Sequence, residues 1–191
     1  MTGASYLPLV QQLASFEPRA YVFGGIAEDA LLDGRITRPH GDVDVLVERE
    51  ALDQHRHQLR AIGFSDFEVY FESPPGMPLV LGSAFDGLSV ELGVFDELEP
   101  GIASFVLPVP EGSVRITLPD DTLRYPVASV EEVPIRTVSP RALYHLREAF
   151  IFTGVFGPAR DKDREAQARL RRELLATVPD GELTPTFVPI A

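Results

Sequence analysis

Two adjacent glycines, Gly24 and Gly25, constrain the fold of this chain more than any other feature of its sequence. They follow an apolar run over 20–23 that is typical of a strand, and they precede residues 26–32, whose pattern predicts a helix that stops at Gly34. Glycine adopts backbone conformations closed to other residues, and it lets another group approach the chain closely. The sequence therefore predicts a strand, a tight turn and a helix in direct succession.

A second predicted strand, over 42–47, carries two acidic residues on one of its faces. Because side chains alternate along a strand, Asp42 and Asp44 lie about 7 Å apart on the same side, and the valines between and after them face the other side. The carboxylates can thus be held by a packed core without entering it. Carboxylate oxygens are the ligands that Mg²⁺ prefers, and protein-bound Mg²⁺ commonly bridges carboxylates to substrate phosphates.

A third acidic residue, Glu91, is predicted on the strand over 88–95. The even-numbered apolar residues of this strand occupy one face and leave Glu91 on the other. A two-metal site for phosphate chemistry needs a third carboxylate, so we expect Asp42, Asp44 and Glu91 to be the metal ligands and the catalytic acids. Asp96 has the opposite parity and ranks second, and an exposed position on an edge strand is the alternative reading of Glu91.

Gly24, Gly25, Arg38 and His40 are the predicted nucleotide-binding residues. Glycine amides at the start of a helix point toward anions and suit a triphosphate. A guanidinium close to Asp42 could neutralise phosphate charge, and an imidazole could donate a hydrogen bond. Two plainer alternatives stay open: the glycines could form only a tight turn, and His40 could be a structural imidazole bonded to a backbone carbonyl.

These motifs resemble the active-site signature of the nucleotidyltransferase superfamily, and most closely that of its small lincosamide and aminoglycoside branch. The residues that carry the resemblance are Gly24-Gly25, Arg35-Ile36-Thr37-Arg38-Pro39-His40 and Asp42-Val43-Asp44. The signature spans about 22–47, and weaker similarity covers 88–96 and 138–170. The resemblance implies Mg²⁺ at Asp42 and Asp44, with Glu91 as third ligand or as the base for the acceptor hydroxyl. It also implies transfer of a nucleoside monophosphate, AMP from ATP, with release of pyrophosphate.

Composition narrows the partners of such a protein. The 191 residues include 29 acidic and 17 basic side chains, for a net charge of −12, which disfavours nucleic acid as a partner. A small, neutral or cationic hydroxyl compound such as an aminoglycoside or a lincosamide fits better as the acceptor, beside a nucleoside triphosphate. The sequence shows neither a secretory signal nor an apolar run long enough to span a membrane, so we expect a cytoplasmic protein. The resemblance leaves a homodimer open.

The order of the predicted elements indicates an α+β fold with a mixed sheet flanked by helices and a short C-terminal helical region. Ser139 and Pro140 begin a helix that ends at Gly154, and the charged run over 160–173 forms another. We expect a nucleotidyltransferase core over 1–137, the helical region over 138–177, and a loose tail over 178–191, where three prolines occur.

Two rival functions stay open. Related small nucleotidyltransferases resemble toxins that modify tRNA or a protein, and a module of this fold could bind nucleotide without catalysis. Lys162 could face a substrate, although the run over 160–165 is also typical of a solvated helix. His55 and His57 are predicted on the polar face of a surface helix and are left out of the site.

Overall fold

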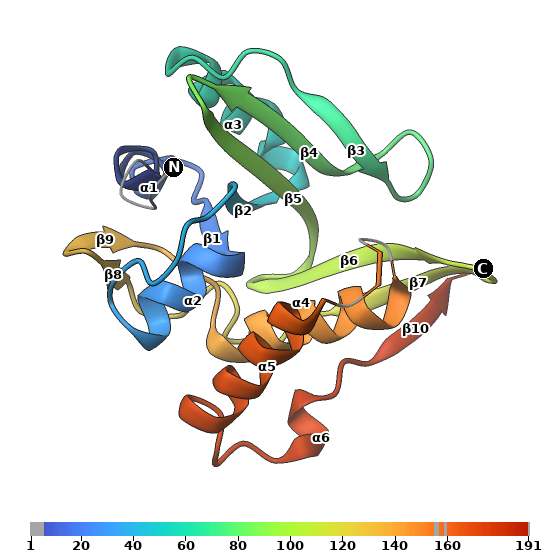
Figure 1. The fold of residues 1–191 in the computed structure, drawn as a ribbon. Helices are drawn as coiled ribbons and strands as arrows, with labels where there is room; N and C mark the ends of the chain where they lie inside the picture. The colour runs from blue at the N-terminus through green and yellow to red at the C-terminus, as the bar shows by residue number, and fades with distance from the viewer. Residues whose placement is uncertain (1–5, 155–156, 159, 191) are drawn as a thin grey trace.

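The computed structural model describes residues 6–154, 157–158 and 160–190 of the chain, which form a mixed sheet flanked by helices, as predicted (Figure 1). The helices are α1 (Leu7–Ala14), α2 (Gly24–Leu32), α3 (Leu52–Ala61), α4 (Pro140–Thr153), α5 (Asp161–Glu173) and α6 (Asp180–Leu183), with a 3-10 turn at Arg49–Ala51. The strands are β1 (Tyr21–Phe23), β2 (Val43–Glu48), β3 (Glu68–Glu72), β4 (Pro78–Phe85), β5 (Leu88–Glu99), β6 (Ile102–Val109), β7 (Gly112–Thr117), β8 (Ala128–Val130), β9 (Val133–Ile135) and β10 (Phe187–Ile190).

Strand β5 organises the sheet because it pairs along its length with three other strands. Its first part lies between β2, to which it is parallel, and β4, to which it is antiparallel. Its last residues pair with β6, which continues through β7 to β10 (Figure 1). β1 pairs antiparallel with β2, and β3 pairs with β4. The strand is therefore shared by the two halves of the sheet.

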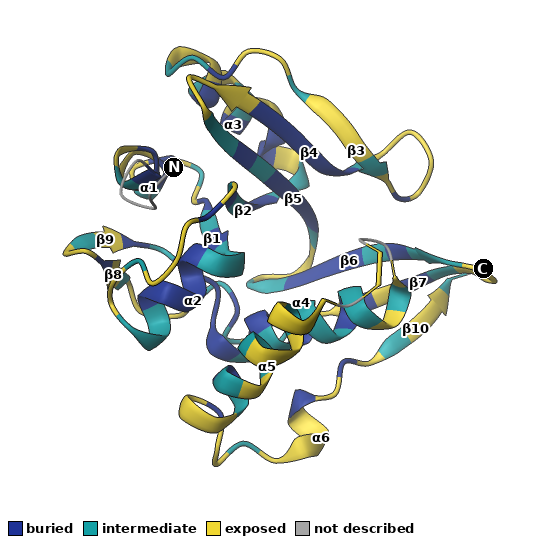
Figure 2. Cartoon of the chain, viewed as in Figure 1, coloured by how far each residue is buried: buried dark blue, intermediate teal, exposed yellow. Residues whose placement is uncertain are grey.

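The valines of β2 alternate with its acidic residue as the sequence predicts. Val43, Val45 and Val47 are all fully buried in the core, whereas Asp44 is only partly buried. Figure 2 shows that most of β4, on the other side of β5, is buried as well. The hydrophobic effect thus fixes which face of β2 turns inward, because a slip of one residue would place the valines in water and the carboxylate in the core.

The boundaries of α4 follow the predicted signals. The hydroxyl oxygen of Ser139 accepts a hydrogen bond of 3.1 Å from the amide of Ala142, Pro140 occupies the first helical position, and Gly154 ends the helix with a φ of +63°. The helix presents Leu143 and Leu146 to the core. Its position brings the C-terminal helical region against the sheet.

Ion pairs join the C-terminal helices to α2. Arg147 on α4 pairs with the buried Glu28 of α2, and Arg169 on α5 donates two hydrogen bonds of 2.8 Å to Asp33 at the end of α2. A buried carboxylate needs such a partner, because an unpaired charge away from water is strongly unfavourable. These contacts hold α5 beside the helix that begins with the two glycines.

The last residues differ from the loose tail that their prolines led us to expect. Residues Phe187–Ile190 form β10, which pairs antiparallel with β7, and the ring of Phe187 stacks on that of Phe152 with centroids 4.1 Å apart. The outer edge of β7 would otherwise leave backbone groups unpaired. Pro189 is compatible with this strand because β10 is itself at the edge of the sheet.

His55 also lies elsewhere than predicted. It is buried on the inner side of α3 and stacks against Phe16, with ring centroids 6.2 Å apart, whereas His57 is exposed. Burial lowers the pKa of the His55 imidazole, and the ring serves there as a flat packing surface. Within the described residues, no helix combines the length and the apolar composition that crossing a membrane requires.

Candidate active site

The three predicted carboxylates converge at one end of the parallel pair β2 and β5. Asp44 lies directly opposite Glu91 in the register of the two strands, and Asp42 immediately precedes β2. One oxygen from each of the three side chains lies within 4.8 Å of the others. Three hard oxygen donors at this spacing are suited to Mg²⁺, which prefers carboxylate ligands and keeps several waters.

The charges of the cluster oppose one another. Burial raises the pKa of Asp44 well above its usual value, and the neighbouring charges of Asp42 and Glu91 raise it further, whereas Arg38 and Lys162 act in the opposite direction. Burial and then Asp42 also raise the pKa of Glu91. A divalent cation would remove this repulsion, so the electrostatics of the cluster match a metal site.

Both glycines are required by side chains that approach them. Gly24 has a φ of +66°, and a Cβ atom there would lie 1.9 Å from Oδ2 of Asp44. A Cβ atom on Gly25 would lie 2.7 Å from Nη2 of Arg38 and 2.7 Å from Nδ1 of His40. The two positions therefore do more than form a tight turn, since they make room for the predicted site residues. The first amides of α2 lie beside the same space.

A buried hydrogen-bond network fixes the loop that leads to Asp42. Asp29 on α2 accepts a bond of 2.8 Å from Nε2 of His40, and it also accepts bonds from the amide and hydroxyl of Thr37. Although burial raises the pKa of Asp29, the bonds from His40 and Thr37 lower it below its usual value overall. An ionised carboxylate can only accept, so Nε2 of His40 donates and its Nδ1 faces Gly25. His40 is thus held by a carboxylate and not by the backbone carbonyl considered above.

Tyr6, which the sequence did not single out, supports the same loop from the other side. Its hydroxyl donates a hydrogen bond of 2.6 Å to the carbonyl oxygen of Gly41, one residue before Asp42. The side chain is fully buried in the core. Nothing in the local sequence marks this contact, because it joins residues 35 positions apart.

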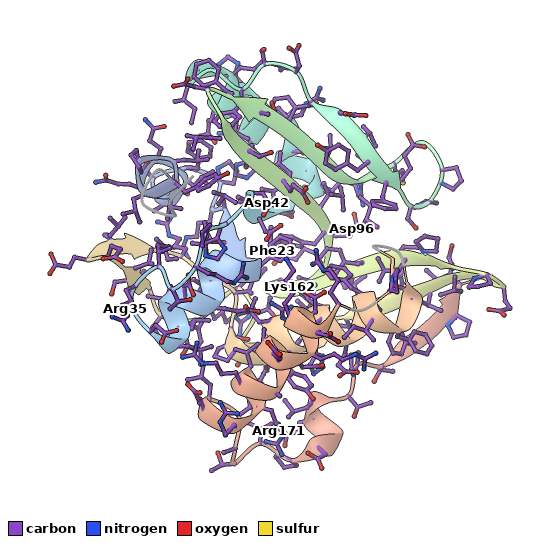
Figure 3. All side chains as sticks on the ribbon, in the orientation of Figure 1. Phe23, Arg35, Asp42, Asp96, Lys162 and Arg171 are labelled. Carbon is purple, nitrogen blue, oxygen red and sulfur yellow. The ribbon has the colours of Figure 1, made fainter. Side chains whose placement is uncertain are left out.

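A cavity of about 500 Å³ contains all the predicted site residues. It is lined by Gly24, Gly25, Arg38, His40, Asp42, Asp44 and Glu91, together with residues of α4 and α5. Figure 3 shows Asp42, Phe23 and Lys162 around the space between the sheet and the C-terminal helices, with Arg35 outside it. The structure therefore gathers the separate motifs of the sequence around one opening.

Lys162 lines this cavity, although its sequence context favoured a solvated helix. Its neighbour Asp163 bonds Arg160 at 2.8 Å and Arg147 of α4 at 3.3 Å, and this pairing orients the start of α5. Arg147 is a second cavity residue that the sequence did not indicate. The alternation of charges along 160–165 could not show which charged side chain lines the cavity.

Asp96 takes no part in the carboxylate cluster. It accepts hydrogen bonds of 2.6 Å and 3.2 Å from Arg49, and it is not among the residues of the cavity. The parity of β5 thus separates Glu91 from Asp96 as the sequence predicts.

Comparison with known proteins identifies the fold. No family model and no curated protein matches the sequence. Among solved structures, the chain resembles ANT(2″)-Ia in complex with adenylyl-2″-tobramycin, with a TM-score of 0.63, 16% identity, and coverage of 94% of this chain and 92% of that one. It also resembles the lincosamide antibiotic adenylyltransferase LnuA bound to lincomycin, with a TM-score of 0.61, 17% identity, and coverage of 90% and 98%. The chain therefore has the fold of these two proteins, in agreement with the fold that its motifs led us to expect.

Proposed function

We propose that the protein is a magnesium-dependent nucleotidyltransferase that transfers a nucleoside monophosphate, AMP from ATP, to a hydroxyl group of a small antibiotic-like acceptor. The observation that carries the proposal is the convergence of Asp42, Asp44 and Glu91 beside the Gly24-Gly25 turn in one cavity. The fold shared with antibiotic adenylyltransferases supports it.

In this proposal the reaction is an in-line displacement at the α-phosphate. The acceptor oxygen forms a bond to phosphorus, the bond to the pyrophosphate oxygen breaks, and the hydroxyl proton passes to Glu91 and then to solvent. Asp42 and Asp44, with Glu91, would hold Mg²⁺, which supplies neutralisation of phosphate charge when bound. Glu91 is suited to accept the proton because its carboxylate lines the cavity beside Asp42 and Asp44, where the acceptor hydroxyl would lie.

The remaining cavity residues would orient the triphosphate. The amides at Gly24 and Gly25 open α2 and point toward anions, and Arg38 lies against Gly25. Lys162 approaches from the opposite wall, where its charge acts on Asp44. Positioning and charge neutralisation of this kind supply most of the acceleration in phosphoryl transfer.

Two observations weigh against the rival functions. The net charge of −12 does not suit a broad contact with tRNA. A non-catalytic module would have no need for three carboxylates held against their mutual repulsion at an open cavity.

A turnover assay tests the proposal. Pyrophosphate release should require ATP, Mg²⁺ and an acceptor, and tobramycin and lincomycin are the first acceptors to try. Asp44→Asn should abolish release and Glu91→Gln should reduce it by at least about 100-fold, with both variants folded. Asp96→Asn is the matched control, because it neutralises a carboxylate of β5 outside the cavity. Retained turnover in Asp44→Asn would refute the assigned role.

A further inference from the structure

We infer that the acceptor is an amphiphilic compound of low positive charge, whose apolar part packs against one wall of the cavity, and that a polycation is a poor substrate. The inference rests on the proposed function, because it concerns the acceptor end of the same site. It narrows the neutral or cationic hydroxyl compound that the net charge suggested, since the charge of the whole chain is not the charge of the cavity.

The first support is the apolar wall that faces the carboxylates. It is formed by α4 and β6. Phe150 and Ile151 are its partly exposed members, and behind them lie the buried residues Leu143, Leu146, Phe105 and Leu107. On α4 these residues recur at helical spacing, so they line one face of the helix. Ile151 is only partly buried, and it therefore keeps apolar surface that a ligand can cover.

The second support is the pairing of the cavity's charges. Besides the carboxylate cluster, the described lining residues include a single further acid, Asp163, and Arg160 and Arg147 both bond it. If the cluster holds Mg²⁺, no lining carboxylate within the described ranges remains for an ammonium group of the acceptor.

The same lining carries several positive charges. Four basic side chains contribute to it: Arg147 and Arg160 are paired with Asp163, and Arg38 and Lys162 are the two that the triphosphate would engage. An acceptor with many ammonium groups would bring like charges together and leave some of them desolvated without a partner, which is strongly unfavourable. A molecule with one basic nitrogen and an apolar substituent meets neither difficulty.

Binding calorimetry with two probe compounds tests this inference without relying on turnover. Lincomycin has one basic nitrogen and alkyl substituents, and tobramycin is a polyamine. With Mg²⁺ and a non-hydrolysable ATP analogue present, we expect lincomycin to bind at least about 10-fold more tightly than tobramycin. Ile151→Ser should weaken lincomycin by about 10-fold, since it removes apolar contact, and leave binding of the nucleotide analogue unchanged.

Charge variants supply the matched control. Ile151→Glu places a carboxylate in the wall and should reduce the ratio of the affinity for lincomycin to the affinity for tobramycin. Val188→Glu makes the same change of charge at an exposed position on β10 outside the cavity, and it should leave the preference unaltered. Equal effects of the two variants would show a long-range effect of charge and overturn the inference.

The inference and the proposed function can fail separately. The inference would be overturned if tobramycin bound more tightly than lincomycin or if neither compound bound. It would also be overturned if Ile151→Ser left the affinity for lincomycin unchanged. Metal-dependent binding of the ATP analogue, lost in Asp44→Asn, would leave the proposed function standing in each of these cases. Failure of the nucleotide analogue to bind at all would overturn the proposed function itself.

Discussion

Replacing Gly24 with alanine should remove activity far more than stability. The added Cβ would lie 1.9 Å from Oδ2 of Asp44, whereas Cβ atoms essentially never approach other heavy atoms within 3.0 Å. The carboxylate oxygen must therefore move by at least about 1 Å, and a displacement of that size at a reacting centre can cost about 100-fold in rate. We expect kcat/KM for pyrophosphate release to fall by at least that factor.

Gly34 offers a matched control for the backbone. Its φ is also +66°, but a Cβ atom there would meet nothing within 4 Å. Gly34→Ala should therefore lower the free energy of unfolding only by the cost of a left-handed backbone at alanine, about 1–2 kcal/mol. In a chain of this size Tm falls by about 2–4 °C for each kcal/mol. Gly24→Ala should lose at least as much stability.

Scanning calorimetry and initial rates of pyrophosphate release, measured on both variants, separate the two effects. If Gly24→Ala, once shown to be folded, kept a rate within about threefold of that of Gly34→Ala, the close approach of Asp44 to this turn would have no catalytic importance. The reasoning that links the glycine pair to the metal ligand would then be wrong.

Three further predictions concern stability. Asp44→Asn should raise Tm in EDTA, because burial and neighbouring carboxylates raise the pKa of Asp44 and disfavour its charge, and the gain should disappear when Mg²⁺ is added to both proteins. Asp29→Asn should lower the free energy of unfolding, measured in urea, by about 1–3 kcal/mol. The difference between the variant and the wild type should vanish as the pH falls through the lowered pKa of Asp29, because the wild-type carboxylate then also loses its charge. Burial lowers the pKa of His55 below 6.5, so the unfolded chain takes up this proton first and stability falls as the pH drops below 6.5. His55→Gln should flatten this decline between about pH 7 and 5 while the exposed His57→Gln should not, and equal slopes in the two variants would contradict the assignment.

Local periodicity was sufficient to predict the carboxylate faces of the site. The alternation along β2 and β5 determines on which side Asp44 and Glu91 lie, because a strand has a side-chain period of two. It could not determine that these strands are parallel neighbours in the register that sets Asp44 against Glu91. That pairing depends on how the intervening hairpin and helix pack, and such information is not local.

The contacts between the C-terminal helices and α2 could not be predicted from the sequence either, because they too join distant parts of the chain. Arg147 and Glu28 are 119 positions apart, and neither is among the motif residues that carry the resemblance. The strand β10 was missed because prolines argue against a strand interior, although they are tolerated at a sheet edge. In both cases the deciding partner comes from a distant part of the chain.

The bridge that Arg147 forms between Glu28 and Asp163 limits how this protein could be re-engineered. A chimera that received α4 and α5 from a relative would leave Glu28 buried opposite an unrelated side chain unless α2 were exchanged as well. Under the proposed function, α4 contributes to the acceptor wall and α2 to the nucleotide site, so the two properties would have to be transplanted together.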